Sequence, residues 1–171
     1  MQHELLNEVD ENDQIISTRS RDELHRLGLR HRAVHILVFN ARGDLFLQKR
    51  SASKDINPNL WDTSAAGHVD LGESYDEAAR RELNEELGVD DPPPLKPIFK
   101  LPSSSETGWE FIQVYTVKHD GPLRLNADEI TEGRWISVTE LNDWIQQGGK
   151  GLTLSFQSLW QTFQQMNKRN P

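Results

Sequence analysis

Three glutamates in the segment GHVDLGESYDEAARRELNEELGV, residues 67–89, have a spacing that could bind a metal ion. Glu82, Glu85 and Glu86 stand at i, i+3 and i+4, and on a helix with about 100° per residue they fall within an arc of about 100°. Like charges at this spacing repel one another, by roughly 0.2–0.5 kcal/mol per close pair on an isolated helix. A hard divalent cation such as Mg2+ offsets that repulsion because it prefers carboxylate oxygens. The competing interpretation is a solvated surface helix rich in Glu and Arg.

Two further charged residues could hold these glutamates in position. Glu73 precedes the expected helix and Arg81 lies two turns along it, so a loop that folds back would let the two side chains pair. Gly67 and Gly72 allow the backbone to turn sharply and to approach a ligand closely. We therefore expect a carboxylate edge that is supported by an Arg–Glu pair.

The residues around the glutamates predict a helix over residues 75–87. Ser74 and Glu77 form an S-x-x-E capping box, and Gly88 stands where a helix usually ends. Apolar residues repeat every four positions along it: Ala79, Leu83 and Leu87. This apolar side should face the core, which places the carboxylates at its edge.

The N-terminal half of the chain predicts two hairpins. Residues 5–20 read as two short strands around the polar turn DENDQ, and residues 21–32 read as a charged connector. The segments 33–39 and 45–50 flank the turn NARGD, which predicts a central hairpin. Residues 51–67 have the Ser, Asp, Asn, Gly and Pro content of a long loop.

The C-terminal half predicts three strands and two helices. The strand-like segments are PIFKLP, WEFIQVYTV and RWISV, and Ser137 and Glu140 form a second capping box. The last helix carries an apolar stripe: Phe156, Leu159, Trp160, Phe163 and Met166. Such a stripe is typical of core packing and not of a ligand site. Strands and helices in irregular order predict an α/β domain with a mixed sheet and helices on its faces.

Composition narrows the class of protein. A chain of 171 residues suits one domain, and 35% hydrophobic with 27% charged residues is typical of a soluble globular protein. The longest apolar run, AVHILVF, is too short for a membrane helix, and the acidic start does not read as a signal peptide. We therefore expect a cytoplasmic protein with no membrane partner. The net charge of -8 argues against nucleic acid as a partner.

The chain has no cysteine. Disulfides, thiolate zinc sites and cysteine nucleophiles are therefore excluded. A small anionic substrate remains compatible with the negative charge when a divalent cation brings it in. The sequence leaves open whether the chain forms a homodimer.

From Gly67 to Val89 the sequence resembles the Nudix box, G-x5-E-x7-R-E-U-x-E-E-x-G-U with U aliphatic. Every restricted position matches: Gly67, Glu73, Arg81, Glu82, Leu83, Glu85, Glu86, Gly88 and Val89. The preceding segment HRAVHILVFNARGDLFLQKRSASKDINPNLWDTSAAGH looks like its counterpart in the branch that includes the isopentenyl-diphosphate isomerases. The resemblance covers roughly residues 1–137, and the expected C-terminal helices at 137–171 are consistent with it.

The resemblance implies an α/β fold, an α/β/α sandwich with a mixed sheet and an N-terminal β-hairpin. It implies a single Nudix domain over residues 1–171. Residues 1–30 would be the hairpin and its connector, residues 67–89 the box, and residues 137–171 the C-terminal helices.

The resemblance also implies an activity and a cofactor. Mg2+, or Mn2+ in its place, would be bound by Glu82, Glu85 and Glu86 with help from the carbonyl of Gly67. The substrate would be a small-molecule diphosphate, usually a nucleoside diphosphate linked to another group, whose diphosphate bond is hydrolysed. Glu82 or Glu85 would lie nearest the attacking water, with Glu86 the firmest metal ligand and Arg81 in support.

Residues outside the box are candidates for the base and for substrate binding. In many relatives the base lies outside the box, and the acidic segment NADEITEGRW offers Glu129; the competing interpretation is a solvated loop. Arg50 and His68 are candidates to contact phosphate, and Trp61 and Trp109 could stack on a base or pack on an apolar group. Core packing is the alternative for the tryptophans.

The isomerase branch supplies an alternative function. Those enzymes use a cysteine ahead of the box where this chain has Ala66, and a methyl group cannot move a proton to or from carbon. The isomerase box is also usually degraded at the glutamates, which are all present here. Both departures favour hydrolysis. A non-catalytic Nudix module that binds a ligand or partner is the other alternative, and loss of the box glutamates would be its usual sign.

Isomerases of that branch also bind a metal through histidines and glutamates. Four residues lie near the corresponding places: His25, His31, His68 and Glu110. The expected second glutamate, two residues before the last of these, is Gly108. The alternative is that His68 orders its loop while the other two histidines are hydrogen-bonded connector residues. His35, inside an apolar strand, reads as a core histidine with satisfied hydrogen bonds.

Overall fold

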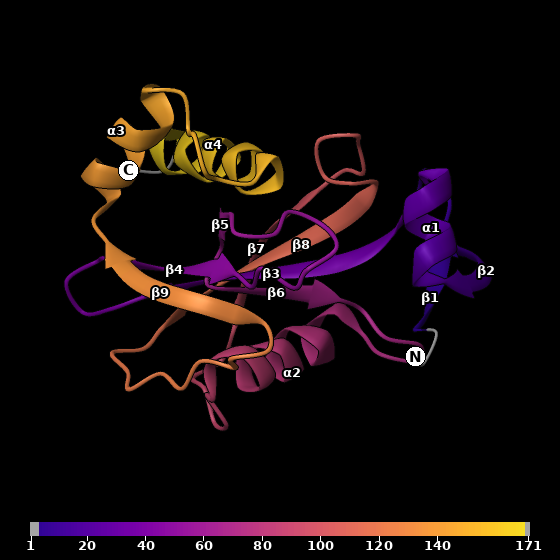
Figure 1. The fold of residues 1–171 in the computed structure, drawn as a ribbon, viewed down its shortest axis with the longest axis horizontal. Coiled ribbons are helices and arrows are strands. Elements are labelled where there is room, and N and C mark those ends of the chain that lie inside the picture. The colour runs from indigo at the N-terminus through magenta and orange to yellow at the C-terminus, as the bar shows by residue number, and fades with distance from the viewer. Residues whose placement is uncertain (1–3, 170–171) are drawn as a thin grey trace.

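The computed structural model describes residues 4–169, which form two sheets and four helices (Figure 1). The elements in chain order are β1 (Leu5–Val9), β2 (Ile15–Ser20), α1 (Arg21–Leu27), β3 (His31–Phe39), β4 (Leu45–Arg50), β5 (Trp61–Asp62), β6 (Ala65–His68), α2 (Tyr75–Leu87), β7 (Lys96–Leu101), β8 (Glu110–Lys118), β9 (Ile130–Ile136), α3 (Val138–Gln146) and α4 (Leu154–Arg169). None of the helices in this part of the chain is long and apolar enough to cross a bilayer.

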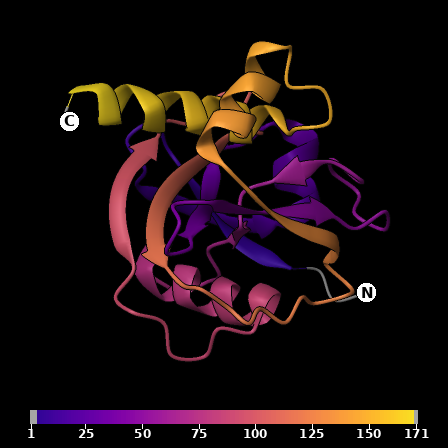
Figure 2. The same cartoon turned by 90° about the vertical axis from the view of Figure 1, so that its left-hand side faces the viewer.

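The main sheet is mixed and has the strand order β5-β4-β3-β8-β7, with β6 beside β3 and β9 beside β4. β3 and β8 are parallel and the other pairs are antiparallel. Figure 2 shows α2 along one face of this sheet and α3 and α4 along the other. The α/β/α layers and the N-terminal antiparallel hairpin β1–β2 confirm the predicted fold. The domain bounds 1–171 stay a prediction, because residues 1–3 and 170–171 lie outside the described part.

The core has two halves, one on each face of the sheet, and alternate side chains of β3 belong to one half or the other. Val34, Ile36 and Val38 face α2 and pack with its apolar side. Ala33 and Leu37 face the other way, toward the C-terminal helices and their predicted stripe. The apolar periods of α2 and α4 are thus core-facing, as the sequence predicts, and the carboxylates of α2 are left at the edge of the sheet.

Two segments differ from expectation. The expected connector 21–32 contains α1, which begins where the Ser20 hydroxyl accepts a hydrogen bond from the Glu23 amide. This helix was not predicted because it has only seven residues and one buried side chain, Leu24, which is too little for an apolar period. The S-x-x-E spacing of Ser20 and Glu23 was the one sequence signal for its start. The expected loop 51–67 contains β5 and the start of β6. These short strands are stabilised by partners distant in sequence, which local composition does not reveal.

The expected central hairpin is formed only at its turn. β3 and β4 pair at one position, Phe39 with Leu45, and then diverge. β6 takes the place of β4 beside β3, and β9 pairs with β4 along its length. The divergence separates the start of β3 from β4. β6 is therefore the neighbour of β3 in the region of the candidate site residues.

The N-terminal hairpin is anchored to the domain by the buried carboxylate of Asp13. Its Oδ1 accepts a hydrogen bond from Arg32 Nε at 2.7 Å. Its Oδ2 accepts hydrogen bonds from the Tyr75 hydroxyl at 2.8 Å and from Lys100 Nζ at 2.7 Å. Burial opposes the charge, but the bonds from Lys100 and Arg32 lower the pKa of Asp13. One carboxylate therefore joins the hairpin turn to β3, α2 and β7.

We expect Asp13→Ala to lower the free energy of unfolding by about 2–4 kcal/mol, because three charged or hydroxyl donors lose one shared acceptor. Urea unfolding measures the change, with the exposed Asp91→Ala as a control that stays within about 0.5 kcal/mol. Because the folded pKa of Asp13 is lowered, its contribution is present above the ordinary value of 3.8 and is lost as the pH falls through the folded value. Equal effects in the two variants would contradict the anchor.

Candidate active site

A cavity of about 900 Å³ brings together residues from α1, the 51–59 loop, β6, α2 and the 104–109 loop. Most of the candidate residues line it: Arg50, Gly67, His68, Arg81, Glu82, Glu85, Glu86, Trp109 and Glu129. Glu73 and Trp61 lie outside this lining. The cavity also contains residues that the sequence did not single out, among them Arg21 and Lys54.

The position of the three glutamates is set by α2. The capping box of Ser74 and Glu77 is formed in full at the start of the helix, and Gly88 ends it with a left-handed backbone. Glu86 is 5% exposed, and its Oε1 accepts hydrogen bonds from the Ala66 amide at 2.7 Å and from Gln48 Nε2 at 3.2 Å. The carboxylate is therefore fixed against β6 and β4.

Glu82 lies directly against the backbone of β6. A Cβ atom added at Gly67 would stand 2.1 Å from Glu82 Oε1, closer than any real contact allows. A side chain at residue 67 would therefore force the Glu82 carboxylate to shift, and the φ angle of Gly67 is not in the left-handed region. Glu85, whose side chain is 55% exposed, completes the set at the solvent side.

The expected Glu73–Arg81 pair is present and bidentate. Arg81 Nε donates to Glu73 Oε1 at 2.7 Å and one terminal nitrogen donates to Oε2 at 3.0 Å. The same guanidinium donates to Glu82 at 2.7 Å, to Glu85 at 3.2 Å and to the carbonyl of His68 at 2.9 Å. A planar donor that serves this many acceptors orients two of the three candidate metal ligands.

Burial makes the carboxylates of α2 unusually basic. It raises the pKa of Glu82 to about 7 and that of Glu86 to about 8, and the charge of Glu82 adds to the effect on Glu86. Both values lie above the ordinary 4.5. Without a cation, the folded chain therefore binds more protons than the unfolded chain at pH values between the ordinary pKa and the raised ones. Stability then falls as the pH rises through that range. Carboxylate oxygens with a nearby backbone carbonyl are the ligands that Mg2+ prefers.

We expect the affinity for Mg2+ or Mn2+ to rise from about pH 6 to about pH 8, because the cation must displace protons from buried carboxylates. Calorimetric titration in buffers of different ionisation enthalpy counts the protons that are released. The count should fall as the pH is raised. Affinity that does not change with pH, with no proton release, would contradict this picture.

The candidate base Glu129 forms an ion pair with Lys54. Arg50 donates two hydrogen bonds to the carbonyl of Ile56, at 2.9 and 3.2 Å. On the other side of the loop, Asp55 accepts a bidentate pair of bonds from Arg21 at 2.7 and 2.9 Å. The 51–59 loop is thus held to both neighbouring walls of the cavity. Lys54 and Arg21 were missed because no local motif marks them.

The two candidate tryptophans lie in different surroundings. Trp61 packs against the core beneath the C-terminal helices, with the Arg134 guanidinium carbon 5.8 Å from its ring centroid. Its placement outside the cavity lining agrees with the core-packing alternative. Trp109 lines the cavity, and its indole lies against Gly28, where an added Cβ would stand 3.1 Å from Nε1.

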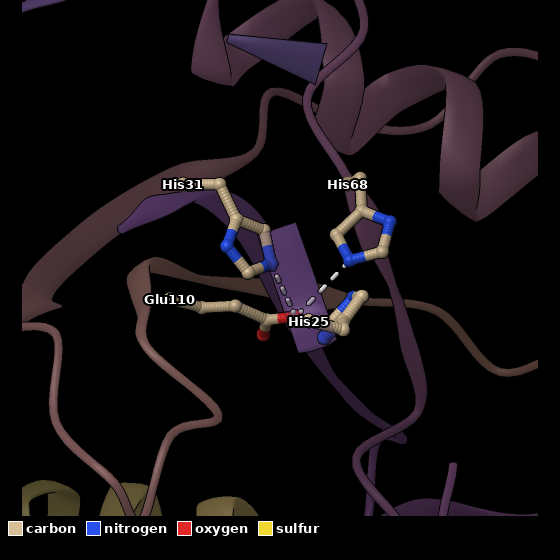
Figure 3. Close-up of side chains that lie close together, drawn as sticks. All are labelled: His25, His31, His68 and Glu110. Carbon is tan, nitrogen blue, oxygen red and sulfur yellow. Dashed lines mark hydrogen bonds and ion pairs between the residues drawn. The ribbon is translucent and has the colours of Figure 1, made fainter. Parts of the chain in front are cut away.

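Three histidines and a glutamate lie close together, and all of them but His31 line the cavity (Figure 3). His25 comes from α1, His31 from β3, His68 from β6 and Glu110 from β8. One ligand atom from each of the four lies within 4.8 Å of the others. Glu110 Oε1 stands 3.1 Å from His68 Nε2 and 3.5 Å from His31 Nε2. The set of three imidazoles and one carboxylate suits a transition metal such as zinc, manganese or iron.

The hydrogen bonding of these rings favours a ligand role. Nε2 of His25 and of His31 is buried without a hydrogen-bond partner in the described structure, which leaves both nitrogens available to a ligand. Nδ1 of His31 contacts the Leu29 carbonyl at 2.9 Å, and Nδ1 of His68 lies 3.5 Å from Glu4. Outer contacts of this kind orient metal-binding imidazoles. The inner nitrogens therefore converge on one point.

The pKa values of the cluster residues are shifted in different directions. Burial, with a further contribution from the other histidines, lowers the pKa of His25 to about 4. Burial opposes the charge of His68, but hydrogen bonds to Glu110 and Glu4 raise its pKa to about 9. The pKa of Glu110 is lowered against its burial by its close contacts with His31 and His68. A bound cation would take the place of the proton on His68 as the partner of the Glu110 charge.

The α/β/α layers and the glutamate-bearing helix α2 are the features on which the chain can be compared with known proteins. The NUDIX domain model matches residues 29–155, and the chain belongs to the Nudix family. Nudix enzymes typically use divalent cations and bind small diphosphate substrates. The matched segment begins after α1, so Glu4, Arg21 and His25 reach the cavity from outside it.

Similar proteins include hydrolases and isomerases. An uncharacterised Nudix hydrolase of Pseudomonas aeruginosa is 40% identical over 133 residues, which cover 78% of each chain. An isopentenyl-diphosphate Delta-isomerase of Photorhabdus laumondii is 33% identical over 162 residues, 91% of this chain and 90% of that protein. A crystal structure from Deinococcus radiodurans has a TM-score of 0.75 with 33% identity, and the match covers 85% of this chain and 90% of that chain.

Proposed function

We propose that the protein hydrolyses the diphosphate bond of a nucleoside diphosphate linked to another group, or of a similar small molecule, with Mg2+ as cofactor and Mn2+ as its substitute. The observation that carries the proposal is the pair of carboxylates Glu82, which lies against Gly67 and accepts a hydrogen bond from Arg81, and Glu86, which accepts one from the Ala66 amide. Burial of two carboxylates whose charges oppose each other is costly without a cation.

Each of these residues has a role in the proposed reaction. Glu82, Glu85 and Glu86, with the carbonyl of Gly67, would hold the cation. When bound, it shields the diphosphate charge and makes a water easier to deprotonate. Glu82 or Glu85 would accept the proton of the attacking water, and Arg81 keeps both carboxylates oriented. Water attacks one phosphorus in line, the bridging P–O bond breaks, and the released phosphate carries the electron pair.

Cations and aromatic side chains on the other walls would bind the substrate. Lys54 and Arg50 stand where phosphate oxygens could replace their present partners, Glu129 and the Ile56 carbonyl. Release of Glu129 from Lys54 would free it as the alternative base. Trp109 is placed at the cavity wall for an aromatic or apolar group, and His68 is a candidate phosphate contact.

A panel of diphosphate compounds tests the proposal. It contains nucleoside diphosphate derivatives, nucleoside triphosphates, coenzymes and isopentenyl diphosphate, each assayed with Mg2+ and with Mn2+. Turnover of at least one P–O–P compound that stops when the cation is chelated is the expected result. Tight, metal-dependent binding without any turnover would replace the proposal with the binding-module alternative.

One observation favours the isomerase alternative, namely the cluster of His25, His31, His68 and Glu110. The absence of a thiol at Ala66 opposes it, because no proton-transferring group stands in that place. Conversion of isopentenyl diphosphate to its double-bond isomer by this cysteine-free chain would show isomerase activity and would contradict the proposed hydrolase function.

We further infer that the four-residue cluster holds a second cation, separate from the one at α2. Dialysis against Zn2+ or Mn2+ followed by elemental analysis should find a tightly bound ion that survives in Glu86→Gln. His31→Ala should weaken its binding by at least about tenfold, because one of four ligands is lost. His119→Ala, at a histidine outside the cluster, is the control. Equal metal content in both histidine variants would contradict the second site.

A further inference from the structure

Gln48 of β4 contacts the candidate metal ligand Glu86 from the protein interior, and the proposed reaction gives it no role. Its side chain is 3% exposed and stands outside the cavity lining. Its backbone is paired on both sides, with Asp62 of β5 and with Gly133 of β9. The amide is therefore held in a fixed part of the sheet, and any effect that it has on a bound cation passes through Glu86.

Two acceptors define which end of the Gln48 amide faces Glu86. Nε2 donates one hydrogen bond to Glu86 Oε1 at 3.2 Å and another to the carbonyl of Ser64 at 3.2 Å. Both partners are acceptors, so the amide nitrogen and not the amide oxygen has to lie between them. Ser64 is fully buried. Its carbonyl thus fixes the orientation in which Gln48 donates to Glu86.

The two oxygens of the Glu86 carboxylate have different surroundings. Oε1 accepts two hydrogen bonds, from Gln48 and from the Ala66 amide at 2.7 Å. Because each carboxylate oxygen has about two lone pairs, these two donors occupy Oε1. Among residues 4–169, the side-chain oxygen of Glu86 that accepts hydrogen bonds is Oε1 alone, and Glu86 lines the cavity. Oε2 is therefore the oxygen that is left to a cation.

A carboxylate with one available oxygen does not suit all divalent cations equally. Mg2+ is small, requires near-ideal octahedral geometry and keeps several of its waters. Ca2+ takes more oxygen ligands, about 6–8, and often binds both oxygens of one carboxylate. Occupation of Oε1 by two donors is compatible with the needs of Mg2+, but it removes an oxygen that Ca2+ could use.

We infer that Gln48 is a positioning residue that limits Glu86 to one metal-binding oxygen and so favours Mg2+ over Ca2+. The inference rests on the proposed function, because Glu86 has to bind the cation. The Ala66 amide alone would leave a lone pair on Oε1 for a cation that binds both oxygens. The side chain of Gln48 is therefore the part of the arrangement that sets the number of available oxygens.

Cation binding by Gln48→Met, measured by calorimetry without substrate, tests the inference. Methionine has a similar volume and no donor, so Oε1 regains a lone pair. The affinity for Mg2+ should fall about tenfold, as is typical when a metal ligand loses its hydrogen-bond partner, while the affinity for Ca2+ stays within about twofold. Binding that is lost in Glu86→Gln is assigned to this site.

Gln113→Met is the matched control. The Gln113 amide is half-buried and donates to the carbonyl of Phe99 at 2.9 Å, outside the cavity lining. This variant also loses a glutamine amide bond to a backbone carbonyl, and it should keep the wild-type ratio of the two affinities. A general loss of stability would lower both affinities together, so the ratio reports on Glu86 itself.

The outcomes separate this inference from the proposed function. Equal losses for both cations in Gln48→Met, or an unchanged ratio, would overturn the inference, and turnover of a diphosphate by the wild type would then leave the proposed function standing. If Glu86→Gln removes no Mg2+ binding from the wild type, both fail.

Infrared spectra of the wild-type protein give a second readout that does not require a folded Gln48 variant. Carboxylate bands that Mg2+ shifts in the wild type, and that are missing in Glu86→Gln, belong to Glu86. Their symmetric and antisymmetric stretches should be widely separated, as is typical of coordination through one oxygen. The narrow separation of coordination through both oxygens would also overturn the inference.

Discussion

Glu86→Gln is expected to lower kcat for the hydrolysed diphosphate by about a thousandfold while the protein stays folded. The carboxylate is 5% exposed, and burial holds its pKa at about 8, so at neutral pH without a cation it is already largely neutral. Glutamine has the same shape and keeps an oxygen to accept the bonds from Ala66 and Gln48. It lacks the negative charge that a divalent cation needs.

Steady-state rates at saturating substrate, together with a Mg2+ titration, measure this effect. The variant should need far more Mg2+ for half-maximal rate, and its melting temperature without cation should match the wild type. Glu140→Gln, at an exposed glutamate of α3, is the matched control and should retain full activity. A loss of less than about tenfold in Glu86→Gln, with unchanged Mg2+ dependence, would remove Glu86 from the proposed site.

Gly67→Ala is expected to lower kcat/KM by about a hundredfold, because a misplacement of about 1 Å in a catalytic group can have that cost. The new Cβ would stand 2.1 Å from Glu82 Oε1 and 2.2 Å from its Cδ. Movement of the Glu82 carboxylate would disturb the hydrogen bond that it accepts from Arg81 at 2.7 Å. Either the carboxylate or the Gly67 carbonyl has to shift, and both belong to the proposed metal site.

Gly43→Ala is the control for loss of a glycine. That residue lies in the turn between β3 and β4, in open space but with a φ of 80°. It should lose about 1 kcal/mol of stability and no activity. Comparison of rates and unfolding free energies in the two variants separates damage to the proposed metal site from a general loss of stability. Full activity in Gly67→Ala would mean that Glu82 is not needed where the structure has it.

The parts of the site that the sequence predicted are those that depend on local spacing. Helix α2 begins and ends at its capping residues, its apolar period faces the core, and Glu73 and Arg81 pair across the loop. Each of these features is set within about two turns of helix or by one short loop. Periodicity and capping rules apply at that range.

The parts that the sequence did not predict depend on contacts between distant segments. Lys54 meets Glu129 and Arg21 meets Asp55 across intervals of 75 and 34 residues. Trp61, for which the sequence left substrate stacking and core packing open, packs against the core where β5 pairs with β4. Such partners follow from strand order, which composition and periodicity do not contain.

The segment before the family match contributes residues to the cavity lining. The family match begins at residue 29, yet α1 contributes Arg21 and His25, and Asp13 anchors the hairpin that precedes it. Helix α1 is therefore part of the cavity wall and supplies one residue of the four-residue cluster. A chain that lacked α1 would keep the glutamates of α2 but lose one side of the cavity.

The most direct test of the central claim is to follow the oxygen of the attacking water. Hydrolysis of the best substrate from the diphosphate panel is carried out in water labelled with heavy oxygen, with Mg2+, and the products are analysed by phosphorus NMR and mass spectrometry. The proposed function predicts that the P–O–P bond is broken and that one product phosphate gains a single labelled oxygen, and that Glu86→Gln forms little of it. Products that contain no label, or an isomerised substrate whose diphosphate is intact, would contradict it.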